Sequence, residues 1–227
     1  MELQSAFVLH TRPYRDTSLL VDLFTAEAGL VTVVARSARG LKSRFQGQLQ
    51  LFKPLWVAWT GRNELKTLVR VEANAQPYML PGQALLCGFY VNELLLRLLD
   101  RQEALVSLFT AYKNVLEELV TSDSNFVCLR YFEIQLLEEV GYGLPFYVDA
   151  KSGDSIEKDK VYFYEHQSGF CEEIYGSGPA VRGATLYELR AKSLNDTAGI
   201  NEAKLLMRYI LSFYLGGKSL KSREMFT

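Results

Sequence analysis

The order of apolar and polar residues predicts short β-strands over roughly the first 75 positions of the chain. Five segments are rich in Val, Leu, Phe, Thr and Trp, which strands favour, and turn signals such as Arg12-Pro13 and Thr60-Gly61 separate them. The expected strands are Gln4–His10, Ser18–Thr25, Gly29–Arg36, Leu49–Trp59 and Glu64–Glu72. Alternation within the last strand predicts that Lys66 and Arg70 lie on one face.

Five short antiparallel strands would leave unpaired edges unless their sheet closes on itself. Closure favours a small barrel over residues 1–79, and the five-stranded oligonucleotide-binding (OB) fold is the leading prediction. An SH3-like barrel has a similar number of strands, and periodicity does not distinguish the two.

Helical periodicity begins after residues 77–82, a Pro- and Gly-containing break with the composition of a linker. Apolar residues then recur every third or fourth position, which predicts packed helices near 86–98, 105–119 and 125–140. Gly141 follows the third stretch and suits a left-handed helix end. Residues 80–227 are therefore expected to form a helical domain.

Two parts of this second region carry other signals. Residues 144–182 lose the helical period, and Val161–Tyr164 with Phe170–Ile174 predicts a small hairpin. Thr185 and Glu188 have the spacing of a capping box, and Asn201 is the expected cap of a last helix. That last helix carries the apolar residues Leu205, Leu206, Tyr209, Ile210 and Phe213. The predicted class is α+β, with a barrel domain followed by a helical domain that contains a hairpin.

Charge separates the two halves of the chain, although the 227 residues together carry a net charge of only −1. Residues 1–80 contain ten basic and six acidic residues, and the remainder contains 15 basic and 20 acidic residues. Between Ala35 and Arg70, eight residues are basic and Glu64 alone is acidic. This asymmetry predicts a polyanionic partner for the N-terminal half, and a merely solvated basic surface is the alternative.

The remaining composition fits a cytoplasmic globular protein. Hydrophobic residues make up 48% of the chain, and no apolar run reaches the roughly 18 residues of a membrane span. The first four residues do not have the pattern of a signal peptide. Cys87, Cys128 and Cys171 are odd in number and far apart, which indicates a reducing compartment rather than a disulfide framework.

The sequence lacks the usual patterns of catalysis. His10 and His166 have no Cys, Ser or second His at a useful spacing. Gly217-Lys218-Ser219 resembles the end of a phosphate-binding loop, but Ser212 stands where that motif requires glycine, and a helix is expected where it requires a strand. We therefore expect a binding protein and not an enzyme.

Chemistry suited to nucleic acid lies between the third and fourth expected strands. Residues 36–45 supply cations for phosphates, serines that can donate to phosphate oxygens, and Phe45, which could stack on an unpaired base or pack in the core. Lys218, Lys221 and Arg223 form a second basic stretch, either an adjoining patch or a frayed tail. The candidate nucleic-acid contacts are Arg12, Arg15, Arg36, Arg39, Lys42, Arg44, Phe45, Lys66, Arg70, Lys218, Lys221 and Arg223.

Motifs along the whole chain resemble the bacterial RecO family of recombination mediators. They include Ala6-Phe7-Val8-Leu9, Arg12-Pro13-Tyr14, Leu51-Phe52-Lys53-Pro54, Tyr90-Val91-Asn92-Glu93-Leu94, Phe132-Glu133, Gly141-Tyr142-Gly143 and Tyr214-Leu215-Gly216-Gly217. The resemblance implies an N-terminal OB fold followed by a helical domain, the same organisation that the periodicity predicts.

The resemblance also implies a function in recombinational repair of DNA damage, in the cytoplasm and at the nucleoid. Members of this family bind single- and double-stranded DNA, anneal complementary strands and, with RecR, help to load RecA onto DNA coated by single-strand-binding protein. The barrel cations would contact DNA. Arg130 would contact the acidic, hydrophobic C-terminal tail of single-strand-binding protein. The alternative is that Arg130 is an ordinary arginine on a helix surface with no role in binding.

The chain departs from the family in one segment. Many members hold zinc with four cysteines after the Gly-Tyr-Gly motif, whereas residues 144–182 contain only Cys171. One thiolate cannot build a tetrahedral site, so we expect no metal or other cofactor, and hairpin packing in place of the zinc site. A protein–protein adaptor whose barrel binds a peptide is the alternative function.

Overall fold

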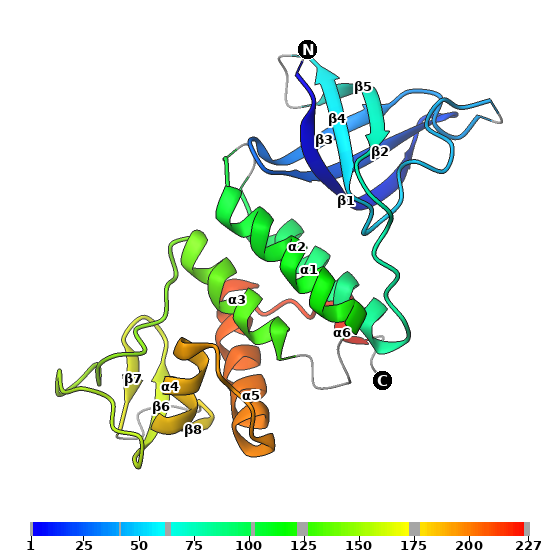
Figure 1. Ribbon diagram of the computed structural model, residues 1–227. Helices are drawn as coiled ribbons and strands as arrows, with labels where there is room; N and C mark the ends of the chain where they lie inside the picture. Colours follow the sequence, from blue (N-terminus) through cyan, green and yellow to red (C-terminus); the bar gives the residue numbers. More distant parts are fainter. Residues whose placement is uncertain are drawn as a thin grey trace. The chain divides into compact units, whose positions relative to one another are not determined.

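The protein is described by a computed structural model that covers residues 2–40, 42–61, 65–100, 103–121, 127–172 and 178–224. The chain divides into two compact units, whose boundary falls after Thr121. The first unit contains a barrel and two helices, drawn from blue to green in Figure 1, and the second contains further helices and a small sheet.

The first strands of the chain close into a barrel. They are β1 (Gln4–Tyr14), β2 (Ser18–Thr25), β3 (Gly29–Ala35), β4 (Leu55–Thr60) and β5 (Lys66–Ala73), and their order is β1-β2-β3-β5-β4. Strands β3 and β5 pair in parallel, and the other neighbours pair antiparallel. This Greek-key order is that of the OB fold, so the predicted fold class is confirmed and the SH3-like alternative is excluded.

Two strands differ from their predicted limits. β1 continues through Arg12 and Pro13, which pair with β2, so the turn predicted there is wrong and the chain turns at residues 15–17 instead. A proline is tolerated where a strand does not need its amide for pairing. β4 begins at Leu55 and not at Leu49, because the chain turns at Phe52, whose φ is +59°.

A β-bulge in β5 changes which side chains face the barrel interior. Val69 is the extra residue, since Leu68 pairs with Trp59 while Arg70 pairs with Ala58. Leu68 and Val71 both lie in the core, so the alternation shifts by one position between them. Lys66 shares the face of Leu68, and Arg70 lies on the outer face. The prediction that Lys66 and Arg70 share a face is therefore wrong.

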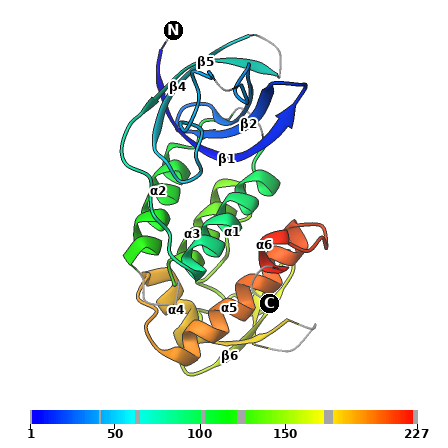
Figure 2. The same ribbon diagram turned by 90° about the vertical axis from the view of Figure 1, so that its right-hand side faces the viewer.

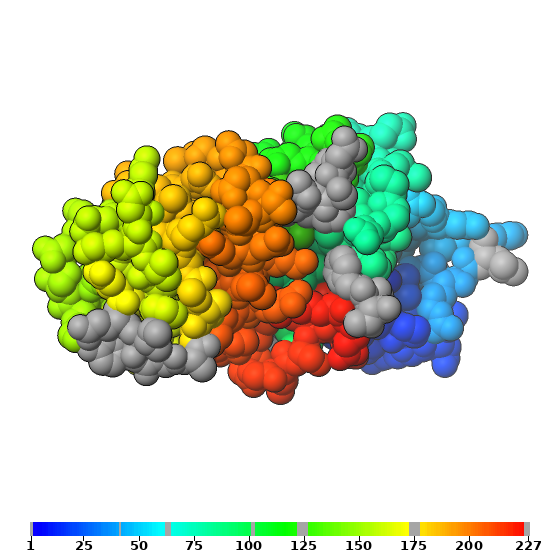
Figure 3. All heavy atoms as spheres, turned by 90° about the horizontal axis from the view of Figure 1, so that it is seen from below, coloured from blue at the N-terminus to red at the C-terminus, as the bar shows by residue number. Residues whose placement is uncertain are grey.

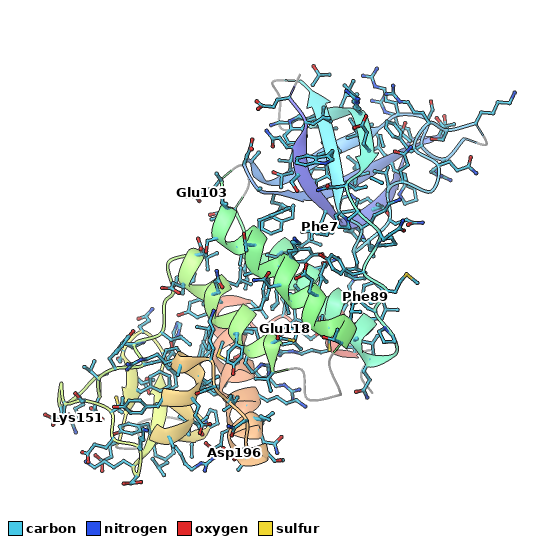
Figure 4. The ribbon with its side chains drawn as sticks, viewed as in Figure 1. Phe7, Phe89, Glu103, Glu118, Lys151 and Asp196 are labelled. Carbon is cyan, nitrogen blue, oxygen red and sulfur yellow. The ribbon has the colours of Figure 1, made fainter. Side chains whose placement is uncertain are left out.

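Helices α1 (Gln83–Leu98) and α2 (Val106–Thr121) pack with the barrel in the first unit. The ring centroids of Phe7 and Phe24 lie 5.5 and 5.4 Å from that of Phe109, and 5.0 and 5.8 Å from that of Tyr112. Figure 4 shows Phe7 where the barrel meets the helices. Because of this aromatic packing, the boundary between the compact units lies well after the domain boundary expected between residues 79 and 80.

A buried polar network also joins the barrel to both helices. Leu9 is the extra residue of a bulge in β1, where the pairing shifts between Val8 and His10. Its carbonyl accepts a hydrogen bond from Asn92 Nδ2 at 3.0 Å, and Asn92 Oδ1 accepts one from the Tyr112 hydroxyl at 2.7 Å. Burial raises the pKa of Tyr112, which keeps the hydroxyl protonated as a donor. These buried polar groups therefore satisfy one another.

The second unit, drawn from light green to red in Figure 2, combines helices with a sheet of order β7-β6-β8. Its elements are α3 (Cys128–Glu139), β6 (Val161–Glu165), β7 (Gly169–Cys171), β8 (Ala180–Arg182), α4 (Gly183–Ala191), α5 (Thr197–Tyr214) and α6 (Lys221–Glu224). Strands β6 and β7 form the predicted hairpin, whose expected last residue, Ile174, lies outside the described residues. The pairing of β8 with β6 adds a strand that was not predicted.

The helix ends agree with the sequence in one case and differ in two. Gly141, with a φ of +84°, ends α3 in a Schellman motif, in which the Tyr142 amide donates to the Leu137 carbonyl at 2.7 Å. The predicted capping box is wrong, because Thr185 lies inside α4 and its hydroxyl donates to Glu202 at 2.6 Å. Asn201 also lies inside its helix, since Asp196 caps α5 by accepting from the Gly199 amide at 2.9 Å.

The buried carboxylate of Asp149 holds the segment that follows α3. Its Oδ1 accepts from the amides of Lys151 and Ser152 at 2.8 and 2.9 Å, and its Oδ2 accepts from the Glu172 amide at 2.7 Å. Burial by itself would raise the pKa of Asp149, but these amides and the charge of Lys151 hold it below its ordinary value of 3.8.

Replacing Asp149 by Asn is expected to lower the free energy of unfolding by about 2 kcal/mol at neutral pH, because three amides lose a charged acceptor. The folded-state pKa is depressed, so this stabilisation is present above the unfolded pKa and is lost as the pH falls through the folded value. In urea unfolding, the difference in the free energy of unfolding between wild type and variant should therefore become smaller from about pH 4 downward. Asp154→Asn, in the same loop but exposed, is the control, and a difference that does not depend on pH would contradict the assignment.

Candidate nucleic-acid interface

Two loops are joined at one end of the barrel, where Figure 1 shows both in blue. They are the β1–β2 turn and the start of the connection from β3 to β4. The Arg39 amide donates to the Thr17 carbonyl at 2.8 Å, and the Ser37 amide donates to Ser18 Oγ at 3.4 Å. Arg15 and Ser37 have φ values of +51° and +55°, so one residue of each loop adopts the left-handed conformation. The backbone thus fixes the loops to each other.

These loops and the adjoining end of β1 carry a group of exposed cations that we call the cationic end. Its members are Arg12, Arg15, Arg36, Arg39, Lys42 and Arg44, all exposed. None of the six forms an ion pair within the described residues of the chain. The structure therefore brings together six of the predicted contacts with their charges available to phosphates.

The aromatic ring of this interface is not the predicted one. Phe45 is only 4% exposed and belongs to the barrel core with residues such as Val33 and Leu55. Of its two predicted roles, core packing is therefore confirmed and stacking on a base is wrong. Burial of its apolar ring stabilises the barrel and removes the ring from solvent. Tyr14, at the end of β1, lies instead among the cations, with the Arg15 guanidinium 5.3 Å from its ring centroid. Its position directly before Arg15 was the sequence signal that could have identified it.

Lys66 and Arg70 do not extend this group as one track. Lys66 is half-buried at the start of β5, paired with Val33 of β3. Arg70, on the outer face, donates from Nε to Glu72 Oε1 at 2.7 Å, so its charge is largely neutralised within β5. Trp56, 37% exposed, is directly across from Glu72 on β4 and is an aromatic that sequence reasoning passed over.

Lys218, Lys221 and Arg223 belong to the second unit. Their segment is not a frayed tail, because it forms α6 and because Leu220 and Ser222 are 1% and 2% exposed. Lys221 and Arg223 are thus presented by an anchored turn of helix, and Lys218 precedes it.

Arg130, predicted to contact the tail of single-strand-binding protein, is largely buried and forms an ion pair within α3. Its side chain is 12% exposed and pairs with Glu133, one helical turn further along α3, whose side chain is 1% exposed. The neighbouring Tyr131 instead lines a pocket of about 220 Å³ together with apolar residues of α3, α4 and the intervening segment. Arg190 and Lys192 lie at this pocket, and the Arg190 guanidinium is 4.4 Å from the ring centroid of Tyr147.

The residues after Gly143 do not fit a zinc site. Cys171 is buried, and burial together with the negative charges of Asp149 and Glu165 raises the pKa of its thiol, which disfavours the thiolate that zinc requires. Among the residues that the structure describes, no three His, Cys, Asp or Glu side chains gather as a metal site. That the protein holds no metal or cofactor stays a prediction. The described helices include none that is long and apolar enough to cross a membrane.

Comparisons with known proteins cover the whole length of the chain. The family model "Recombination protein O N terminal" matches residues 1–76, and "Recombination protein O C terminal" matches residues 81–224. The chain is 47% identical to the DNA repair protein RecO of Coxiella burnetii (strain RSA 331 / Henzerling II), over 98% of this chain and 97% of that protein. It is 43% identical to the protein of the same name from Haemophilus influenzae (strain 86-028NP), over 100% and 96%. For Methylococcus capsulatus the identity is 42%, over 99% and 92%.

Proposed function

The chain belongs to the RecO family of DNA repair and recombination proteins, and on that premise we propose that it is a non-enzymatic recombination mediator. It binds single- and double-stranded DNA through the cationic end and anneals complementary strands. Together with RecR, it helps to load RecA onto DNA that is coated by single-strand-binding protein. It acts in the cytoplasm, at the nucleoid.

The observation that carries this proposal is the cationic end itself. Six exposed cations, none of which forms an ion pair among the residues that the structure describes, lie on two loops and the adjoining end of β1. They belong to an OB barrel, a fold that binds oligonucleotides beside its first turn. Cations that neutralise phosphates release counterions, and the same neutralisation lets two backbones approach until complementary bases meet. Tyr14 adds a ring on which an unpaired base can stack.

The pocket beside Tyr131 supports recruitment by single-strand-binding protein. The tail of that protein is both acidic and hydrophobic, as the resemblance implies. The pocket combines apolar walls with two cations, Arg190 and Lys192, against one acid, Glu138. Neither cation has an ion pair among the described residues, so both can receive carboxylates. We assign the tail to this pocket in place of the Arg130 guanidinium, which Glu133 already holds.

Replacing Arg39 and Lys42 together by Ala is expected to flatten the salt dependence of single-strand binding. The slope of log affinity against log salt should fall by about 0.7 for each lost phosphate contact, or about 1.4 for the pair. Fluorescence anisotropy with a labelled oligothymidylate over a salt series measures it. Lys113→Ala, on α2 and already paired with Glu117 at 3.7 Å, is the control that should leave the slope unchanged.

An unchanged slope in the double variant would favour the adaptor alternative, in which the barrel binds a peptide and the cations are incidental. A strand-annealing assay with and without single-strand-binding protein then separates DNA binding from partner recognition. The proposed function requires annealing of bare strands and continued annealing when they are coated.

A further inference from the structure

Helix α5 carries apolar residues outside the face that is buried in the core. Ala203, Leu206, Met207, Ile210 and Leu211 are fully buried. Leu205, Tyr209 and Phe213 form another row, spaced four residues apart, and Leu205 and Phe213 are 55% and 37% exposed. Figure 3 shows α5, in orange, at the surface beside the yellow part of the second unit. Its sequence thus leaves an apolar row that core packing does not explain.

Rings from two other segments extend this row into one connected surface. His166, at the β6–β7 turn, stacks on Phe213 with centroids 4.3 Å apart and planes 10° apart. Tyr142, which ends α3 and is 48% exposed, stacks on Tyr214 at 4.2 Å. We call Tyr142, His166, Tyr209, Phe213 and Tyr214 the α5 aromatic surface. Tyr142 and Phe213, which are 48% and 37% exposed, offer ring surface on which a flat ligand can stack.

A row of cations runs beside this surface on the same helix. Lys204 and Arg208 are exposed, are one turn apart, and each directly precedes a member of the apolar row. Neither forms an ion pair within the described residues. The nearest acid along α5, Glu202, is occupied by Arg182 and Thr185, and Glu165 lies next to His166 on β6. The two cations thus adjoin the part of the row that contains Leu205 and Tyr209.

We propose that the α5 aromatic surface, with Lys204 and Arg208, binds the unpaired nucleotides of a single DNA strand. The bases stack on the rings, and the phosphates contact the two cations. A duplex does not fit this chemistry, because its bases already stack on each other. The inference rests on the proposed function and deepens it: the cationic end and the α5 surface each hold one strand, so one chain carries both partners of an annealing reaction.

Two double variants of the full chain test this proposal. Tyr209→Ala with Phe213→Ala removes two rings, and Lys204→Gln with Arg208→Gln removes the charges while leaving the rings in place. Each is expected to slow annealing of complementary oligonucleotides at least about tenfold, the first through the loss of one or two stacked bases and the second through the loss of two phosphate contacts. Each should leave the affinity for a first oligothymidylate within about twofold, because the cationic end is intact. Val161→Ala, which removes a similarly exposed apolar residue from β6, is the control.

The outcomes distinguish this inference from the function on which it rests. Unchanged annealing in the Lys204 and Arg208 variant, which removes only exposed side chains and should fold normally, would overturn the inference. The inference would also be overturned if the variants annealed bare strands normally and lost annealing only of strands coated by single-strand-binding protein. In that case the surface would bind a protein and not DNA. If the proposed function itself fails, the wild-type chain will not bind oligothymidylate or the Arg39 and Lys42 variant will keep the wild-type salt slope.

Discussion

Replacing Asn92 by Leu should lower the free energy of unfolding by about 3 kcal/mol, although leucine matches the apolar helix around it. The substitution leaves the Leu9 carbonyl and the Tyr112 hydroxyl buried without their partner, since Asn92 bonds to both. Each unsatisfied buried group costs about 1–3 kcal/mol, and leucine recovers only part of this through its own burial. Urea unfolding followed by circular dichroism measures the loss.

Tyr112→Phe is the matched control for this network. It removes one hydroxyl but leaves Asn92 bonded to Leu9, so its cost should be about 1 kcal/mol. The double variant of Asn92→Leu with Tyr112→Phe should be more stable than the sum of the two changes predicts, because the phenyl ring no longer leaves a hydroxyl stranded. Additive losses would show that Asn92 and Tyr112 do not act as one network.

Replacing Gly29 by Ala is expected to lower the free energy of unfolding of the first unit by more than about 3 kcal/mol. Gly29 begins β3 with a φ of +58°, and a Cβ built there would stand 2.1 Å from the backbone oxygen of Glu103. A flexible side chain could move aside, but this backbone precedes α2 and is held by the packing of that helix on the barrel. The left-handed conformation alone costs an alanine only about 1 kcal/mol.

Gly47→Ala separates these two effects. Gly47 has a similar φ of +68°, but nothing lies within 4 Å of the Cβ position. Its substitution should cost about 1 kcal/mol, the conformational part alone. Equal thermal unfolding midpoints for the two variants would show that the backbone before α2 can shift at little cost. The contact with Glu103 would then not contribute to the loss of stability.

The strands, the barrel closure and the main helices could be predicted because periodicity of apolar residues reports directly on which face is buried. The bulges could not. Leu9 and Val69 are ordinary strand residues, and an extra residue changes the register without changing composition. The bulge at Val69 also affects the candidate site, because it places Lys66 and Arg70 on different faces of β5. The bulge at Leu9 also explains Asn92, which donates to the Leu9 carbonyl and which the sequence showed only as a polar residue within an apolar helix and a family motif.

The cations of the interface could be predicted because charged side chains remain exposed wherever their loops lie. The aromatic ring could not, since whether Phe45 or Tyr14 faces solvent depends on how the connection between β3 and β4 folds over the barrel end. Arg130 is a different case. Glu133 follows it at the spacing of one helical turn, so the internal ion pair was readable from the sequence.

The hydrogen bonds that Ser37 and Arg39 donate to Ser18 Oγ and the Thr17 carbonyl also affect how fast the protein associates with DNA. The arginines on these loops are positioned before DNA arrives, so association requires no loop closure as a separate slow step. Diffusion in the field of the cationic end then sets the rate of capture, and added salt should act mainly by slowing association. For the proposed binding of single strands, this means that a strand is held at first contact.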